Sequence, residues 1–393
     1  MKFALFREDT DKGSAVWNQE LIFVGGWLSR ATYDLELADI GAQWTKASGP
    51  EGPSSEVRSK LIERAIHTLR FFTFHRSTPS QQVSQLLLDS FFSCGKNTDF
   101  LLITTMGVRK VSEIRRPDAK FAGFLKVLPV LPDDVVTSAP IMISALESRG
   151  MLKNIIFDDV LNELRNRPLP EDEMVACLKW WITTYGDSSP SRELLVIRKE
   201  LLDAAILIRS HSISGKTSVI PLSTIKTFLN TKSSNMSIPL DGPLPDDMLP
   251  VSVTKELTPH SLAKAMPWEE LTIPQWVRYI CREDVCANDA KFDISKSIQW
   301  ADRVLIALSK HWMASLSKEQ KTEIVADLLG RTCIPTRSHG LRKPQDAYFQ
   351  NAALFPDLPV ITFPSGTAIK GPLEKLLIDV GVRKHVELYV YFC

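Results

Sequence analysis

Apolar residues recur three and four positions apart over much of the chain, a spacing that predicts amphipathic helices. Val57, Leu61 and Leu69 form one such stripe, and Ser54 or Ser55 precedes it as a candidate N-cap. The same spacing predicts helices at about 79–92, 133–150, 158–166, 174–186, 194–208, 261–265, 274–282 and 293–312. We expect Gly150 to end the helix that starts near 133 and Asp293 to cap the last helix.

Two stretches interrupt this helical pattern. The first 53 residues contain three tryptophans, the pair Gly25-Gly26 and a Gly/Pro-rich break at 48–53. We therefore expect an irregular segment there, the tail of a missing upstream domain. Residues 211–255 are rich in Ser, Thr and Pro, and their prolines at 239–250 exclude a helix in that stretch. Ser218–Leu222 is the one candidate strand in this crossover.

A short module occurs twice. Residues 103–110, 118–121 and 128–131 resemble residues 334–343, 346–349 and 358–361, in the same order. Each copy predicts a short strand, a glycine turn, a helical turn that carries a Phe inward, and a strand entered through Leu-Pro. Gly-Val-Arg-Lys recurs once more at 381–384. Two real copies would mean a repeated architecture, and chance similarity of short motifs is the alternative.

These elements predict an α+β, mainly α fold in which helical bundles are separated by small strand-containing repeat modules. A length of 393 residues fits two to three domains of about 150 residues each. The expected divisions are an irregular segment at 1–53, a mainly helical domain at 54–210, a crossover at 211–255 and a helical domain at 256–393. The first module lies at about 101–132, and the second lies at about 331–393.

The modules are locally basic although the whole chain has a net charge of only +1, which argues against binding nucleic acid over the entire surface. A basic module is typical of a contact surface for an acidic protein, a phosphate or RNA. The alternative is a solvated loop that is balanced by acidic stretches such as 171–173. The candidate partner-binding residues are Arg109, Lys110, Arg115, Arg116, Arg342, Lys343, Arg383 and Lys384.

Motifs for catalysis, cofactors and metals are weak. Gly215-Lys216-Thr217 resembles the end of a phosphate-binding loop, but Ser210 stands where the first glycine is needed and a helix is predicted before it. Cys281 and Cys286 have no second ligand pair at zinc spacing. The seven histidines are scattered, without a metal-binding or nucleophile pattern. We therefore expect no catalytic, metal-binding or cofactor-binding residue in this chain.

Composition narrows the location. Apolar residues at 44% and charged residues at 24% are ordinary globular proportions, which excludes wholesale disorder and fibrous classes. Six cysteines without framework spacing favour a reducing compartment. Charged residues at 7–9 argue against a signal peptide, and no apolar run reaches the length of a membrane span. We expect a cytoplasmic protein without membrane contact, and a nuclear location stays open.

Several stretches carry a family resemblance. Residues 17–21, 71–75, 128–132, 174–181 and 381–386 resemble a family of large uncharacterised fungal proteins related to sacsin and to the plant protein NO VEIN. In that family an ATPase of the histidine-kinase and chaperone type precedes a region like this one. The magnesium-binding Asn and the glycine-bearing adenine loop of that ATPase have no counterpart here, so no catalytic residue carries over. The resemblance implies that ATP binds only in a missing upstream domain.

Together these features lead to the expectation of a non-catalytic interaction and coupling region, a fragment of a large chaperone-like ATPase-family protein. Its expected partner is a protein or a protein client. One alternative is binding of nucleic acid or another acidic partner through the basic modules. Another alternative is a degenerate remnant without activity.

Overall fold

The computed structural model describes residues 15–48, 52–72, 91–92, 101–186, 192–210, 217–231, 237–350 and 357–386. The chain divides into two compact units, residues 1–166 and residues 167–393, and each unit is described by itself. This division after Asn166 differs from the expected boundaries at 53, 210 and 255. Helices dominate both units, and each sheet of the described part has two short strands. The predicted α+β, mainly α class is confirmed.

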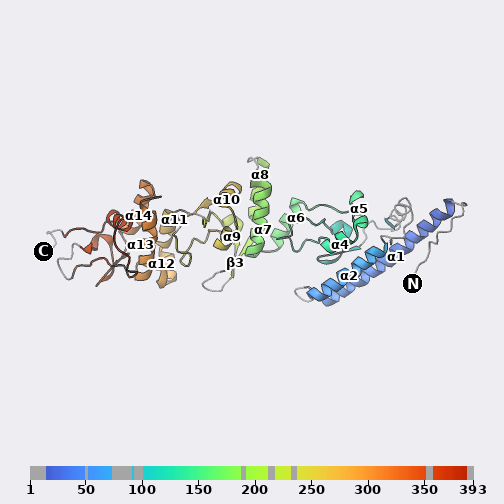
Figure 1. Ribbon diagram of the computed structural model, residues 1–393, viewed down its shortest axis with the longest axis horizontal. Helices are drawn as coiled ribbons and strands as arrows, with labels where there is room; N and C mark the ends of the chain where they lie inside the picture. Colours follow the sequence, from blue (N-terminus) through green and yellow to red (C-terminus); the bar gives the residue numbers. More distant parts are fainter. Residues whose placement is uncertain are drawn as a thin grey trace. The chain divides into compact units, whose positions relative to one another are not determined.

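The described part of the first unit contains a pair of long helices, three shorter helices and a small hairpin. Its helices are α1 (Ala15–Ala47), α2 (Ser55–Phe72), α4 (Asp133–Ser138), α5 (Pro140–Ser148) and α6 (Phe157–Asn166), and its strands are β1 (Leu101–Thr104) and β2 (Gly107–Lys110). α1 and α2 lie side by side (Figure 1, blue). The Ser54 hydroxyl accepts a hydrogen bond from the Val57 N–H at 3.5 Å, which confirms the predicted N-cap of α2.

The helix α1 corrects the expectation of an irregular N-terminal segment. Tyr33, Leu37, Ile40 and Trp44 are all buried, at steps of four, three and four residues. This face packs in one core with α2 and the β1–β2 hairpin. Each glycine inside a helix costs about 1 kcal/mol relative to Ala, whereas burial of each large apolar side chain contributes about 1.5–3 kcal/mol. Tyr33 and Trp44 therefore belong to a buried helix face and not to a loop.

The predicted helix at 133–150 is two helices. α4 ends and α5 begins around Ala139, because Pro140 has no N–H and disfavours a helical conformation at the residue before it. The apolar stripe continues across the break, since Val135, Met142 and Leu146 are all fully buried. Gly150, with φ +64°, follows the end of α5 as predicted.

The described part of the second unit contains more helices than that of the first unit, together with three pairs of strands. Its helices are α7 (Glu171–Trp181), α8 (Arg192–Ala204), α9 (Val251–Lys255), α10 (Pro259–Ala265), α11 (Ile273–Ile280), α12 (Glu283–Asn288), α13 (Ile298–Trp312), α14 (Lys318–Leu329) and α15 (Pro372–Val380). Its strands are β3 (Ile206–Ser210), β4 (Thr217–Pro221), β5 (Thr227–Phe228), β6 (Glu269–Glu270), β7 (Ile334–Thr336) and β8 (Gly340–Arg342). Thus the 211–255 crossover contains the two strands β4 and β5 and the whole of α9, and its predicted strand corresponds to β4.

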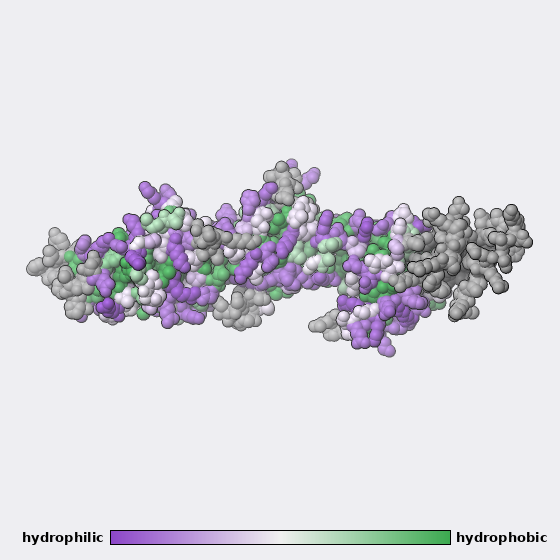
Figure 2. All heavy atoms as spheres, in the orientation of Figure 1, coloured by the Kyte–Doolittle hydropathy of each residue, from purple (hydrophilic) through white to green (hydrophobic). Residues whose placement is uncertain are grey.

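The second unit has its own core around α13. Trp300, Val304, Leu308 and Trp312 are buried at steps of four residues, and α15 lies beside α13 (Figure 1, orange and red). α13 begins later than predicted, because the Ser297 hydroxyl and not Asp293 caps it. In the view of Figure 2, hydrophilic residues cover most of the coloured surface, with smaller apolar areas between them.

One further predicted helix is shorter than expected, and another lies mostly outside the described residues. The helix at 194–208 ends at Ala204, and Ile208 lies on β3. Of the helix at 79–92, only Phe91 and Phe92 belong to the described residues, and both are helical.

Candidate functional site

The two predicted modules share one backbone plan. Each starts with an antiparallel hairpin that turns at a glycine in the left-handed region, Gly107 at φ +90° and Gly340 at φ +66°. The hydroxyl of Thr104 donates to the Gly107 carbonyl at 2.6 Å, and the hydroxyl of Thr336 donates to the Gly340 carbonyl at 2.8 Å. A 3-10 turn follows directly in both copies, η1 (Val111–Glu113) and η5 (Pro344–Asp346), with its first residue buried.

A central extended segment, which contains Arg115 in the first copy and Tyr348 in the second, completes each module. In the first copy the Arg115 N–H donates to the Pro129 carbonyl at 3.0 Å, and the Leu131 N–H donates to the Arg115 carbonyl at 3.4 Å. On its other edge this segment pairs in parallel with Lys153. The central segment thus lies between two stretches that come later in the chain.

The second predicted copy repeats these hydrogen bonds. The Tyr348 N–H donates to the Pro359 carbonyl at 3.0 Å, and the Ile361 N–H donates to the Tyr348 carbonyl at 2.9 Å. Arg383 takes the place of Lys153 on the other edge. The match extends over non-local bonds, which supports a real repeat over chance similarity of short motifs.

A third copy lies between these two in the sequence; it extends from β3 to β6 and overlaps the stretch interpreted as a crossover. The β3–β4 hairpin is followed by η3 (Leu222–Thr224) and by β5, which pairs in parallel with Met248 on one edge and with β6 on the other. The Thr227 N–H donates to the Asp247 carbonyl at 3.3 Å, and the Leu249 N–H donates to the Thr227 carbonyl at 2.9 Å. The Leu-Pro pair of this copy is Leu244-Pro245. It lies farther ahead of Met248, the residue that pairs with β5, than Leu-Pro lies ahead of the corresponding residue in the other two copies.

Four of the eight candidate cations occupy equivalent, exposed positions. Arg109 and Lys110 close the first hairpin, and Arg342 and Lys343 close the hairpin at β7–β8, at the same distances from the turn glycine. All four side chains are exposed. Within the described part of the chain, none of them forms an ion pair. The middle copy has Ile220 and Pro221 at these two positions.

The other two candidates of the first copy have structural partners. The Arg115 guanidinium donates two hydrogen bonds to the Asp159 carboxylate, at 2.7 and 2.9 Å, and both side chains are largely buried. Arg116 forms an ion pair with Glu147 at 3.2 Å. Arg115 therefore holds the start of α6 against the module and is withdrawn from the surface.

The remaining two candidates lie beside the central segment of the second predicted copy. The Arg383 guanidinium lies over the Tyr348 ring at 5.9 Å from its centroid, and Lys384 lies 3.4 Å from the Glu374 carboxylate. Gly381 precedes them with φ +110° and ends α15. The second Gly-Val-Arg-Lys, at 381–384, thus lies at the end of a helix and not in another hairpin, although the first glycine of the motif is left-handed in both settings.

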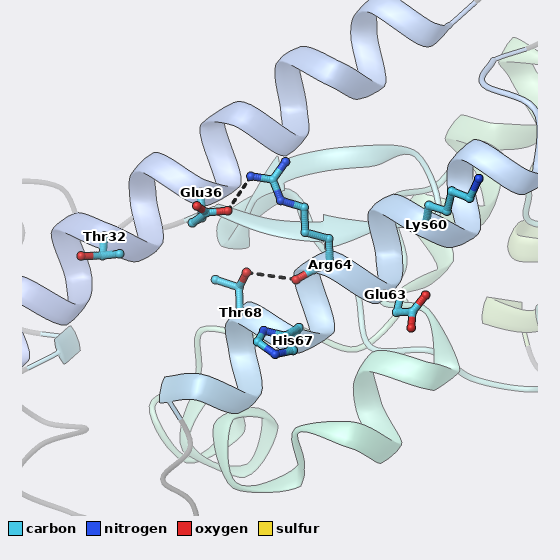
Figure 3. A pocket seen from close by; sticks show the side chains of 7 residues that line it. All are labelled: Thr32, Glu36, Lys60, Glu63, Arg64, His67 and Thr68. Carbon is cyan, nitrogen blue, oxygen red and sulfur yellow. Dashed lines mark hydrogen bonds and ion pairs between the residues drawn. The ribbon is translucent and has the colours of Figure 1, made fainter. Parts of the chain in front are cut away.

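A charged groove lies between α1 and α2 (Figure 3). It has a volume of about 510 Å³. Arg64 forms ion pairs with Glu36 at 2.6 Å and with Asp39 at 2.7 Å, and these hydrogen bonds raise the pKa of Arg64. Glu63, Lys60 and His67 are exposed along α2. Acids and bases balance across the groove, so its geometry favours helix pairing over binding of a charged ligand.

Two buried carboxylates elsewhere, those of Glu163 and Asp302, are held by hydrogen bonds within the fold. Glu163 accepts hydrogen bonds from the N–H groups of Lys126, Val127 and Leu128. Asp302 accepts hydrogen bonds from the N–H and the hydroxyl of Ser365 at 3.2 and 3.0 Å. Carboxylates held by several donors stabilise loops and have little capacity left for a substrate.

Three thiols of the described residues are buried and protonated. Burial raises the pKa of Cys177, Cys281 and Cys333 to about 12, which makes them poor nucleophiles and metal ligands. Among the described residues, His, Cys, Asp and Glu side chains form no group of three that could hold a metal ion. Gly215 and Lys216 of the weak phosphate-loop motif lie outside those residues.

Fold and site together define an α+β protein built on a repeated strand-and-turn module with exposed basic pairs. The chain belongs to the family described as "Protein of unknown function (DUF3684)", whose model matches residues 10–393. No curated protein and no solved structure matches the chain. No helix within the described ranges is long and apolar enough to cross a membrane.

Proposed function

We propose that this chain is a non-catalytic interaction and coupling region of a large chaperone-like protein of the ATPase class that the sequence resembles, and that it binds a protein partner. The observation that carries the proposal is the equivalent placement of Arg109-Lys110 and Arg342-Lys343 in two copies of one module. Exposed cations stay hydrated, so they carry no desolvation penalty, and they can pair with acidic side chains of a partner. The other four candidate cations have partners in the fold, since Arg115, Arg116 and Lys384 pair with carboxylates and Arg383 lies over the Tyr348 ring.

The state of the ionisable groups supports a non-catalytic role. The buried carboxylates accept hydrogen bonds from backbone or side-chain donors, and the three most buried thiols have a strongly raised pKa. A catalytic acid, base or nucleophile needs a free reactive face and a pKa near the working pH. These groups instead hold loops and fill the core.

Proximity labelling in cells tests the partner proposal. One variant carries Arg109→Glu, Lys110→Glu, Arg342→Glu and Lys343→Glu, and the control variant carries Lys264→Glu and Lys318→Glu at exposed positions outside the hairpins. The first variant should lose a defined set of labelled proteins that the wild type and the control retain. Identical labelling by all three proteins would contradict the proposal.

An assay of ATP hydrolysis by the purified chain tests the non-catalytic part. The expected rate is that of the buffer alone. Hydrolysis above this rate that disappears on substitution of a single Arg or Glu would overturn the proposal.

Binding of nucleic acid through the same four cations is the second candidate. Because phosphate contacts release counterions, such binding should weaken steeply as salt rises. Fluorescence anisotropy with a single-stranded RNA at two salt concentrations separates the two candidates. A steep salt dependence that the four charge reversals abolish would favour RNA over an acidic protein.

A further inference from the structure

The middle module differs from its two relatives in the charge of its surroundings. Where the other copies carry Arg-Lys, it carries Ile220 and Pro221. A groove of about 630 Å³ lies beside it, between the start of α7, the end of α9 and strand β3. The residues that line this groove include three carboxylates and no cationic side chain, whereas Lys60 and Arg64 line the groove between α1 and α2.

The floor of the groove is apolar. Pro170, Val175 and Ile208 line it, and all three are only partly buried. Ile208 lies directly opposite Val219 on the neighbouring strand, so both side chains are on the same face of the hairpin. Val219 is 63% exposed. The apolar surface thus continues from the groove across β4.

The rim of the groove is acidic. Glu171 and Asp172 stand in the first turn of α7, where negative charge favours the helix N-terminus. Glu256 follows the last residue of α9, where a negative charge opposes the helix dipole. Helix stabilisation therefore accounts for the first two carboxylates and does not account for Glu256. Lys179, 3.5 Å from Glu256, offsets one charge weakly, since both side chains are more than half exposed.

We infer that this groove, lined by Glu171, Asp172, Glu256, Val175 and Ile208, binds a cationic polypeptide segment in which Lys or Arg alternates with apolar side chains. Charge complementarity selects a positive occupant and excludes nucleic acid, whose phosphates the three carboxylates repel. The apolar floor accepts side chains rather than a bare cation. This surface is separate from the basic hairpins, so the chain has two contact sites of opposite charge.

Fluorescence anisotropy with labelled synthetic peptides tests the inference on the full chain. The probe alternates Lys with Val, and its matched control alternates Lys with Ser. The Lys/Val peptide should bind, and the variant Glu171→Lys, Asp172→Lys, Glu256→Lys should weaken this binding by roughly tenfold or more, because the charge contacts of the three carboxylates add. Val219→Ser should weaken it further without changing the fold, since that side chain is exposed.

A control variant separates this groove from acidity in general. Asp133→Lys with Asp134→Lys reverses two exposed first-turn acids of α4 in the other unit, and it should leave peptide affinity unchanged. Equal loss of affinity in this control, equally tight binding of the Lys/Ser peptide, or no binding of the Lys/Val peptide would each overturn the inference. So would wild-type self-association in sedimentation that the triple variant lacks, since the occupant would then be a second copy of the chain.

Discussion

Arg115 shows how a cation on a basic loop becomes part of the core. Its sequence neighbourhood is no different from that of Arg109, yet its guanidinium meets Asp159, which lies 44 residues further along the chain. Asp159 also accepts a hydrogen bond from the Ile156 N–H at 3.1 Å, so it caps α6 while it pairs with Arg115. One carboxylate thereby joins the module to the helix that follows it.

Arg115→Ala should be strongly destabilising, because it leaves the Asp159 carboxylate buried without its counter-charge. Breaking such a pair from one side costs about 3–5 kcal/mol. Arg109→Ala, at an exposed position, should change stability by no more than about 0.5 kcal/mol. Urea unfolding of the two variants checks this, and equal effects would show that Arg115 is not a structural residue.

His311 predicts a pH dependence of stability. Its side chain is buried, and burial, followed by the charge of Lys310, lowers its pKa below 6.5. The unfolded chain therefore takes up a proton near pH 6.5 while the folded chain stays neutral, so stability falls as the pH drops from that value toward the folded pKa. The slope for one proton is at most about 1.4 kcal/mol per pH unit.

His311→Gln should flatten this part of the pH profile of the unfolding free energy. His260→Gln is the control, since His260 is exposed, and it should leave the slope as in the wild type. Parallel profiles for the wild type and His311→Gln would contradict the assignment.

Among the elements, most helices with a long apolar stripe were predictable, with α1 as an exception, whereas the middle module as a whole was not. α2, α6 and α7 follow from apolar stripes that span several turns. The strands of the middle module have two to five residues and pair partly with segments about 20 to 40 residues away, which leave no periodicity to read. Within the site, the repeat points to Arg109-Lys110 and Arg342-Lys343, but only the fold shows that Arg115 is buried against Asp159.

The hairpin turns offer a matched pair of glycine substitutions. Both glycines are left-handed, and Ala in that conformation costs about 1–2 kcal/mol. A Cβ at Gly107 would lie 3.0 Å from the Trp44 ring, whereas a Cβ at Gly340 meets nothing within 4 Å. Gly340→Ala should therefore cost only the backbone term, and Gly107→Ala should cost about 1–3 kcal/mol more from overpacking. Chemical denaturation measures both, and equal losses would mean that α1 does not cover the first hairpin.

At the scale of the whole molecule, the two units have separate cores. Tyr33, Leu102 and Val135 belong to one, and Trp300, Leu308 and Leu377 belong to the other. Large chains with several cores depart from two-state unfolding more often than small single domains do. Local substitutions should therefore act on one unit at a time.

Unfolding of the intact chain by urea should show two transitions. Arg115→Ala should lower the urea midpoint of one transition. Leu308→Ala, at a fully buried position, should lower the midpoint of the other, because it reduces the free energy of unfolding by about 2–5 kcal/mol. Tryptophan fluorescence and far-UV circular dichroism measure the transitions. One common transition that both substitutions shift would show that the units unfold as a single cooperative body.

The arrangement of each module also sets an order of events during synthesis. The central segment needs both a nearby strand and a second one, at Lys153, Glu269 or Arg383, that follows it by roughly 40 residues. At translation rates of about 5–20 residues per second, the ribosome delivers this last strand roughly 2 to 8 seconds after the central segment. Throughout that interval an open strand edge is exposed to neighbouring nascent chains. Each of the three modules therefore passes once, in every round of translation, through an interval in which it can misassemble on the polysome.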